Sequence, residues 1–339
     1  MTDEVLTGSR RISLVRPRLD AKPWGGTALR QFGMDIADEE MIGEALVTAN
    51  DAVITGGFGA GTTLGEIIAD DPGHRLGELG LSIVGGRALF PLLVKLIDAN
   101  QDLSIQVHPN DQQAAPLDRL GKTEAWVILD SRSDGRLYLG LQNPDDLAGF
   151  AAAAGLLDGS SASHLRSIPA AKGSVWLLPA GTIHALGAGV LVYEIQQPSD
   201  MTFRLDDWGR VDAFGNPREM HHEAGLAVAR PDFQPSAIGS VRIESAGTDR
   251  EVLVACRYFA LERWDWHVAE GELLPESAAP QVLTVLEHSL EVGGFSLNTG
   301  ESAVIWPGNG PVMLNSDNAI VLRGWIPDAS DTCATGTSE

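Results

Sequence analysis

Short runs of β-branched and other apolar residues recur along most of the chain, and Gly, Pro, Asn and Asp separate them. Apolar runs of this length, bounded by turn residues, are typical of β-strands. Many of them at close spacing predict an all-β sandwich or barrel. The predicted strands carry the sequences RISLV, AVIT, SIQV, AWVIL, SVWLL, VLVYEIQ, QVLTVLEHSLEV and SAVIW.

Three segments depart from this pattern and predict helices between the strand clusters. Residues 88–99 (ALFPLLVKLIDA) place apolar side chains on one broad face. Residues 143–159 open with NPDD and close on glycine, which are start and stop signals of a helix. Residues 218–230 (REMHHEAGLAVAR) predict a third, shorter helix. We expect all three to be insertions on a β scaffold.

The β-rich sequence falls into two blocks, at residues 103–205 and 241–326. A length of 339 residues also favours two domains, at roughly 150 residues each. Residues 230–240 contain two prolines and no periodicity, which is typical of a linker. The expected organisation is a catalytic domain at 1–230, a second β domain at 241–327 and a disordered tail at 328–339.

Charge and composition narrow the classes of function. The formal net charge of −22 excludes nonspecific binding to nucleic acid or to an anionic membrane, because both need a positive field. No run of about 18 apolar residues predicts a transmembrane helix, and residues 1–11 lack the apolar core of a signal peptide. Two cysteines, Cys256 and Cys333, form no disulfide framework. These features together predict a cytoplasmic protein.

Four side chains from three segments form a candidate metal site. Gln106 and His108 are two residues apart on a predicted strand and therefore point to the same face. Glu124 begins the next strand, and His184 follows the turn PAGTI. Each residue alone has a structural explanation, as a hydrogen-bonded histidine or a solvated acid. Two imidazoles, a carboxylate and an amide oxygen together suit an open, catalytic Zn²⁺ site.

The interval from Gly173 to His184 reads G-x5-P-x-G-x2-H, which is the second motif of the cupin superfamily. The first cupin motif usually has H-x-H and then a nearby Glu. Here Gln106 replaces the first His, and the gap to Glu124 is longer. Residues 300–310 repeat the order Gly, apolar strand, Pro and Gly without a histidine. We therefore expect a mainly β fold of cupin (jelly-roll) barrels, an N-terminal catalytic one and a degenerate C-terminal one, with a few inserted helices.

Both departures from the first motif are shared by the type I mannose-6-phosphate isomerases, and the chain resembles their short bacterial form over nearly its whole length. Ala45 stands where that family usually has a tryptophan. The segments that carry the resemblance are KPWGGTALRQFG (22–33), IGEA (42–45), FPLLVKLIDANQDLSIQVHPND (90–111), GKTEAWVILD (121–130), LLPAGTIHALG (177–187), EIQQPSDMTFRLDDWGR (194–210) and REMHHEAGL (218–226).

The resemblance implies one Zn²⁺ ion per chain, bound by His108, Glu124 and His184 with Gln106 as the fourth ligand. It implies interconversion of mannose 6-phosphate and fructose 6-phosphate, in which a proton moves between C2 and C1 through a cis-enediol. It also implies that Arg204 is the active-site arginine.

The general base stays open at this stage. Glu194, in LVYEIQ, is the first candidate, because a carboxylate that points into the barrel among apolar neighbours can remove a proton. Glu194 can equally hold Arg204 or Lys122 through a salt bridge. Asp200 and a zinc-bound water are the rivals.

The substrate phosphate requires local positive charge in a negative chain. Lys122 lies two residues before Glu124 and is expected on the same face. Lys122, Arg204 or Arg210 would meet the phosphate together with a hydroxyl such as that of Ser104. For Arg210, a surface salt bridge with Asp206 or Asp212 is favoured instead.

Two other classes of function compete with an isomerase. One is a metal-binding cupin without catalysis that senses a sugar phosphate. The other is an iron-dependent oxygenase, which Gln106, Lys122 and Arg204 disfavour. The expected partner is a hexose 6-phosphate, not nucleic acid or membrane, and the chain is expected to be a monomer or a homodimer.

Overall fold

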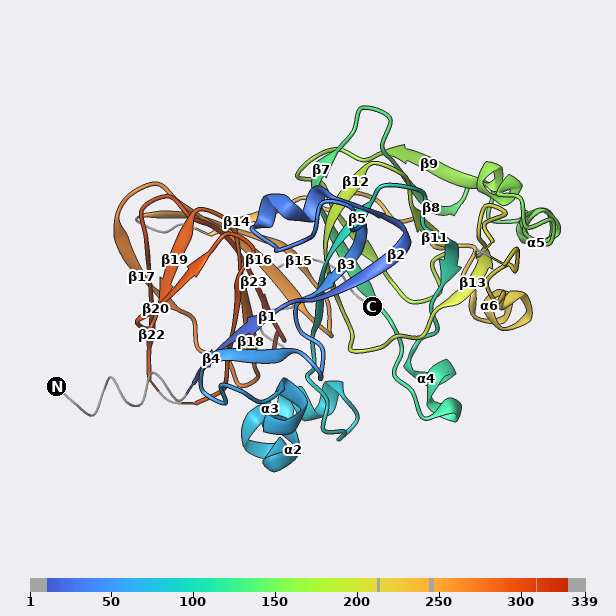
Figure 1. Ribbon diagram of the computed structural model, residues 1–339. Helices are drawn as coiled ribbons and strands as arrows, with labels where there is room; N and C mark the ends of the chain where they lie inside the picture. The colour runs from blue at the N-terminus through green and yellow to red at the C-terminus, as the bar shows by residue number, and fades with distance from the viewer. Residues whose placement is uncertain (1–10, 212–213, 244–246, 309, 329–339) are drawn as a thin grey trace.

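The computed structural model describes residues 11–211, 214–243, 247–308 and 310–328, and β-strands dominate it (Figure 1). The mainly β class is therefore confirmed, and each of the predicted strand sequences contributes a strand. The described strands lie in four open sheets and form no closed barrel. These sheets pack face to face as four layers, because each of three apolar clusters draws residues from two neighbouring sheets.

The first two layers contain the candidate metal ligands. The six-stranded sheet has the order β10 (Val175–Leu178), β7 (Glu124–Ser131), β12 (Val190–Gln196), β5 (Leu93–Ala99), β3 (Ile42–Leu46) and β2 (Arg18–Gly26). The five-stranded sheet that covers it has the order β13 (Phe203–Asp206), β6 (Ile105–Val107), β11 (His184–Leu186), β8 (Arg136–Leu141) and β9 (Leu165–Pro169).

The other two layers hold most of the C-terminal sequence. The eight-stranded sheet has the order β14 (Val241–Ile243), β15 (Thr248–Ala255), β16 (Ala260–Trp266), β23 (Ile320–Trp325), β18 (Gln281–Glu287), β21 (Ser302–Ile305), β1 (Ile12–Arg16) and β4 (Val53–Gly57). The outer four-stranded sheet has the order β17 (Glu270–Leu274), β22 (Val312–Ser316), β19 (Ser289–Val292) and β20 (Phe295–Asn298).

Two N-terminal strands belong to the C-terminal sheet. Figure 1 shows β1 and β4, in blue, beside the orange and red strands. β1 pairs with β21 on one side, where Ile12 faces Ile305, and with β4 on the other. If the chain is divided into domains at 1–230 and 241–327, as predicted, two strands of the first domain therefore belong to the sheet of the second.

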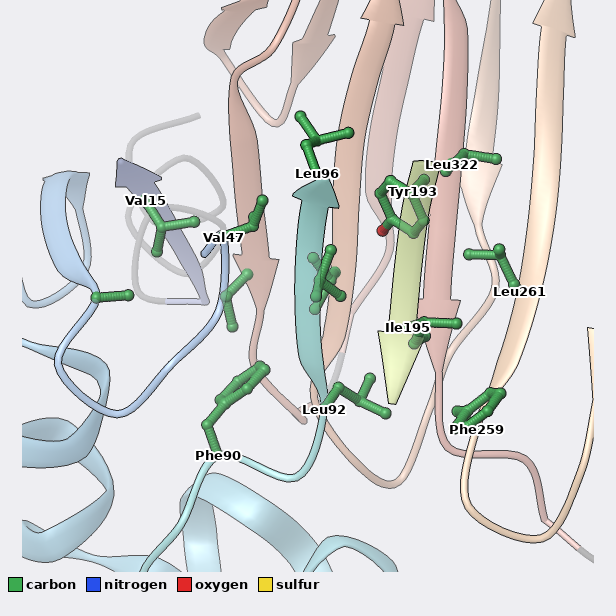
Figure 2. Packing of buried hydrophobic residues seen from close by; sticks show 14 of the residues in the cluster. Val15, Val47, Phe90, Leu92, Leu96, Tyr193, Ile195, Phe259, Leu261 and Leu322 are labelled. Carbon is green, nitrogen blue, oxygen red and sulfur yellow. The ribbon is translucent and has the colours of Figure 1, made fainter. Parts of the chain in front are cut away.

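The six- and eight-stranded sheets pack against each other through a shared apolar core. Figure 2 shows Tyr193 and Ile195 of β12 facing Leu261 and Leu322 of the opposite sheet. Successive side chains of a strand point to opposite faces. Glu194, between these two residues, therefore points away from this core and toward the five-stranded sheet.

The helices agree only in part with expectation. The segments predicted at 143–159 and 218–230 contain α5 (Leu147–Ala154) and α6 (His222–Val228). The helix predicted at 88–99 is wrong, because residues 93–99 form β5. A continuous apolar run also fits a strand that is buried on both faces, and periodicity alone does not separate the two.

Three further α-helices are described: α2 (Leu64–Asp70), α3 (Pro72–Ile83) and α4 (Asp111–Ala114). Three short 3-10 helices complete the described elements: η1 (Ala28–Phe32), η2 (Ala115–Leu117) and η3 (Ser160–His164). Helix α2 begins with a capping box of Thr63 and Glu66, a signal that the sequence reading missed. No helix in the described ranges is both long and apolar enough to cross a membrane. The tail predicted at 328–339 lies outside the described residues, apart from Asp328.

Candidate metal centre and its cavity

Three of the predicted ligands converge at the ends of three strands. His108 follows β6 directly, Glu124 begins β7 and His184 begins β11. Their ligand atoms all lie within 4.8 Å of one another. The two Nε2 atoms of His108 and His184 are 3.4 Å and 3.2 Å from the two carboxylate oxygens of Glu124. All three side chains are buried, so the cluster is a preformed group of metal-binding atoms.

Hydrogen bonds orient both imidazoles toward the centre of the cluster. His108 Nδ1 donates to the Met201 carbonyl (2.8 Å), and His184 Nδ1 donates to the Thr182 carbonyl (2.9 Å). Each Nε2 is thus left with a lone pair that faces Glu124. Burial, assisted by the charge of Lys122, lowers the pKa of His108 to about 3. His108 is therefore neutral at pH 7, the form in which imidazole binds a metal.

Glu124 supplies the negative charge. Burial opposes its ionisation, but the neighbouring Lys122 and the two histidines hold its pKa well below the usual range. Within the described chain, neither of its buried oxygens accepts a hydrogen bond, although Lys122 Nζ makes an ion pair at 2.8 Å. A buried carboxylate without hydrogen bonds is costly, and a cation bound by both histidines would compensate it. The donor set accordingly fits a divalent metal.

Gln106 adjoins the cluster as its strand position predicts. It pairs with His184 of β11 on one side and with Arg204 of β13 on the other, so the three side chains lie in one row across the sheet. Its Nε2 is 3.2 Å from His184 Nε2. Rotation of the amide would turn Oε1 toward the same point, which is the orientation that a metal ligand needs.

A cavity of about 420 Å³ opens beside the cluster, between the six- and five-stranded sheets. Gln106 and Lys122 line it, and both contact the cluster. Its walls contain six basic and four acidic side chains, an excess of positive charge inside a chain of net charge −22. Such a site favours an anionic ligand. The basic residues are Arg18, Lys22, Lys95, Lys122, Arg204 and Arg218, and the acidic ones are Asp20, Glu44, Glu194 and Asp200.

Glu194 lies in the wall of the cavity and has partners that the sequence did not suggest. Its Oε1 is 3.3 Å from Lys95 Nζ, and its Oε2 accepts a hydrogen bond from Trp126 Nε1 (2.9 Å). The salt bridge considered with Arg204 or Lys122 is not present in the described structure. Burial opposes the charge of Lys95, but Glu194 and Glu44 raise its pKa above the usual value.

Arg204 is half-buried, and its guanidinium reaches the same cavity. Its Nη1 donates to the Glu219 carbonyl (2.8 Å), while Nε is buried without a partner in the described structure. Burial lowers the pKa of Arg204, and the positive charge of Arg218 acts in the same direction. Among the described residues no carboxylate forms a salt bridge with Arg204, which leaves its charge available for an anion.

Asp207 holds two other arginines. Arg210 and Arg218 both donate to it, and Arg210 also donates to the Asp102 carbonyl. The predicted partner Asp206 is wrong for Arg210, since its carboxylate accepts from Ser161 instead, and Asp212 lies outside the described residues. Arg218, which the sequence reading missed, lines the cavity, whereas Arg210 does not.

Comparisons with known proteins point to one family. Residues 14–133 match the family described as phosphomannose isomerase type I, catalytic domain. The chain is 35% identical over 260 residues to the mannose-6-phosphate isomerase ManA of Bacillus subtilis (74% of this chain, 78% of that protein). It is 30% identical over 278 residues to the mannose-6-phosphate isomerase of Streptococcus mutans (79% of this chain, 82% of that protein).

Solved structures give the same result for the fold. A crystal structure of the mannose 6-phosphate isomerase from Bacillus subtilis has a TM-score of 0.78 and 28% identity, and the match covers 92% of this chain and 99% of the other. A zinc-bound mannose 6-phosphate isomerase has a TM-score of 0.73, with 94% and 100% covered. At 17% identity, the second match concerns the fold alone.

Proposed function

The chain belongs to the type I phosphomannose isomerase family, and on this premise we propose that it interconverts mannose 6-phosphate and fructose 6-phosphate. The observation that carries the proposal is the buried cluster of His108, Glu124 and His184 beside a cavity with excess positive charge. A sugar phosphate offers neighbouring oxygens to a metal and a dianionic phosphate to basic side chains.

We propose one Zn²⁺ ion per chain, held by His108, Glu124 and His184, with Oε1 of Gln106 as the fourth ligand. Neutral imidazoles and a single carboxylate leave such an ion most of its positive charge. When bound, zinc supplies Lewis acidity and a template for two substrate oxygens. The buried carboxylate of Glu124, which lacks hydrogen bonds, supports this assignment.

We propose Glu194 as the group that moves the proton between C2 and C1 of the sugar. Its carboxylate lines the cavity, is 4% exposed and is fixed in orientation by Lys95 and Trp126. The rival Asp200 has a side chain that is 82% exposed and pairs with Arg119 at 3.7 Å. A base needs to be held at a defined position beside the migrating proton, which favours Glu194.

Arg204 and Lys122 are proposed to stabilise negative charge on the substrate. Lys122 Nζ lies 3.1 Å from His108 Nε2, so it lies at the end of the cavity next to the metal cluster, where the sugar carbons would bind. Arg204, together with Arg218 and the hydroxyl of Ser104, lines the cavity and suits the phosphate. Arg210 donates to the Asp207 carboxylate and to the Asp102 carbonyl, and it would affect the cavity only through Asp207.

A coupled assay for fructose 6-phosphate, with and without a chelator, tests the proposal. We expect formation from mannose 6-phosphate that the chelator abolishes and that Zn²⁺ restores. No turnover of any hexose or pentose 6-phosphate after zinc is restored would contradict it and favour a sensor without catalysis. A cytoplasmic location and a monomeric or homodimeric state remain predictions from the sequence.

A further inference from the structure

Residues 121–124 carry both Lys122 and Glu124, and their backbone is held at every amide before Glu124. Gly121 N donates to Asp111 Oδ1 (2.8 Å). Lys122 N donates to the Pro109 carbonyl (2.9 Å). Thr123 N donates to Gln197 Oε1 (2.9 Å). The position of a metal ligand and of a catalytic cation therefore depends on what holds these acceptors.

Asp111 holds residues 121–124 in two ways, directly at Gly121 and through Gln197 at Thr123. Its Oδ1 accepts from Gln197 Nε2 (3.0 Å) as well as from Gly121, so it fixes the amide that binds Thr123. Its Oδ2 accepts from the hydroxyl of Tyr258 (2.9 Å). Gln197 is 1% exposed and Tyr258 is 7% exposed, so both donors are shielded from water, whereas the Asp111 carboxylate that accepts from them is half-buried.

Tyr258 comes from the other half of the chain. It lies between β15 and β16 of the eight-stranded sheet, and the next residue, Phe259, packs in the core between the two sheets (Figure 2). The packing of Phe259 therefore holds the backbone from which the hydroxyl of Tyr258 contacts Asp111.

The backbones at Asp111 and Gly121 are in direct contact. A Cβ atom at Gly121 would lie 2.5 Å from Asp111 N and 2.6 Å from the carbonyl carbon of Asn110. Contacts of this kind leave no room for the two segments to move independently. A shift of Asp111 is accordingly transmitted to residues 121–124.

We infer that Asp111 and Tyr258 are positioning residues, through which the C-terminal sheet sets the place of Lys122 and Glu124. Neither touches the metal cluster or lines the cavity in the described structure; both act through residues 121–124. The kinetic part of this inference rests on the proposed isomerase function, and its metal-binding part does not.

The test compares Asp111→Ala, Tyr258→Phe, the double variant and Asp111→Asn. Each full-length zinc-loaded protein is titrated with a chelator to follow zinc release, and kcat and KM are measured with mannose 6-phosphate. Because a displacement of about 1 Å can cost about 100-fold in rate, we expect Asp111→Ala to lower kcat at least tenfold and to weaken zinc retention about tenfold. Tyr258→Phe should give a smaller loss, about threefold, in both.

The double variant should equal Asp111→Ala in both readouts, because the inferred effect of the hydroxyl on residues 121–124 passes through the Asp111 carboxylate. Asp111→Asn should recover activity to within about threefold, since its Oδ1 accepts both N–H groups and its Nδ2 can donate to Tyr258. Tyr193→Phe is the matched control. It removes another buried tyrosine hydroxyl between the same two sheets, one that contacts Thr284, and should change neither readout.

If Tyr258→Phe lowers only the melting temperature, or if its effects add fully to those of Asp111→Ala, the contact is structural and the inference is wrong. If the unmodified protein does not turn over mannose 6-phosphate while zinc retention follows the expected order, the proposed function fails and the inference stands.

Discussion

Replacing Lys95 with methionine tests how the wall of the cavity is held together. Lys95 of β5 faces Glu194 of β12 directly across the sheet. Its Nζ is 3.3 Å from Glu194 and 3.8 Å from Glu44, and its side chain is 12% exposed. The substitution keeps the length of the side chain and leaves a buried carboxylate without its cation.

The expected loss follows from these distances. At an effective dielectric constant of about 20, unit charges at 3.3 Å attract each other by about 5 kcal/mol, and at 3.8 Å by about 4 kcal/mol. Desolvation of the lysine opposes this, and removal of one partner from a buried pair typically costs about 3–5 kcal/mol. Glu44 keeps Lys22 at 2.9 Å, so most of the loss falls on Glu194. We expect Lys95→Met to lower the free energy of unfolding by about 3 kcal/mol.

Urea unfolding of the metal-free protein at pH 7.5 measures this loss. The pKa of Lys95 is raised in the folded state, so its contribution is complete below the usual pKa of lysine and disappears only at higher pH. The double variant Lys95→Met/Glu194→Gln should recover about 1–2 kcal/mol, because no unpaired charge remains. A loss below about 1 kcal/mol, or strict additivity in the double variant, would refute the reasoning.

Three further outcomes follow from the site. His184→Ala should lose zinc on dialysis, whereas Arg204→Ala should keep zinc and lose about 100-fold in kcat; normal turnover of the latter would contradict its role. Because the pKa of His108 is depressed in the folded state, the metal-free protein should lose stability as pH falls below about 6.5, by about 1.4 kcal/mol between pH 7.5 and 5.5. Urea unfolding of His108→Gln should lack that share, and an equal loss in both chains would argue against a neutral imidazole. Trp126→Phe removes the indole donor to Glu194, and kcat should fall several-fold at unchanged zinc content, as metal analysis beside the assay would reveal.

The candidate metal ligands could be predicted from the sequence because each lies in a local pattern. Gln106 and His108 follow the period of two of a strand, and His184 follows a turn of fixed length. Local patterns state which residues share a face, but not which strands become neighbours. The partners of Glu194 are Lys95 and Trp126, which come from two other strands, β5 and β7, and only the order of the sheet brings them together.

The position of Lys95 in the cavity could not be predicted from the sequence for a second reason. The run at 88–99 is apolar almost throughout, so it fits a buried helix as well as a strand with both faces covered. The structure covers both faces of β5, one by the five-stranded sheet and one by the eight-stranded sheet. An element with two apolar faces carries no alternation that would identify the lysine as a cavity residue.

The long-range pairing of β1 bears on how the protein is made. Trp306 Nε1 donates to Ser13 Oγ across 293 residues of sequence, and β1 has β21 as one of its two neighbours. During synthesis the first strand must wait for almost the whole chain before its sheet can be completed. Pairing between such distant segments forms slowly. We expect chains stalled before residue 302 to expose an unfinished apolar sheet face, which makes them early targets of chaperones and proteases.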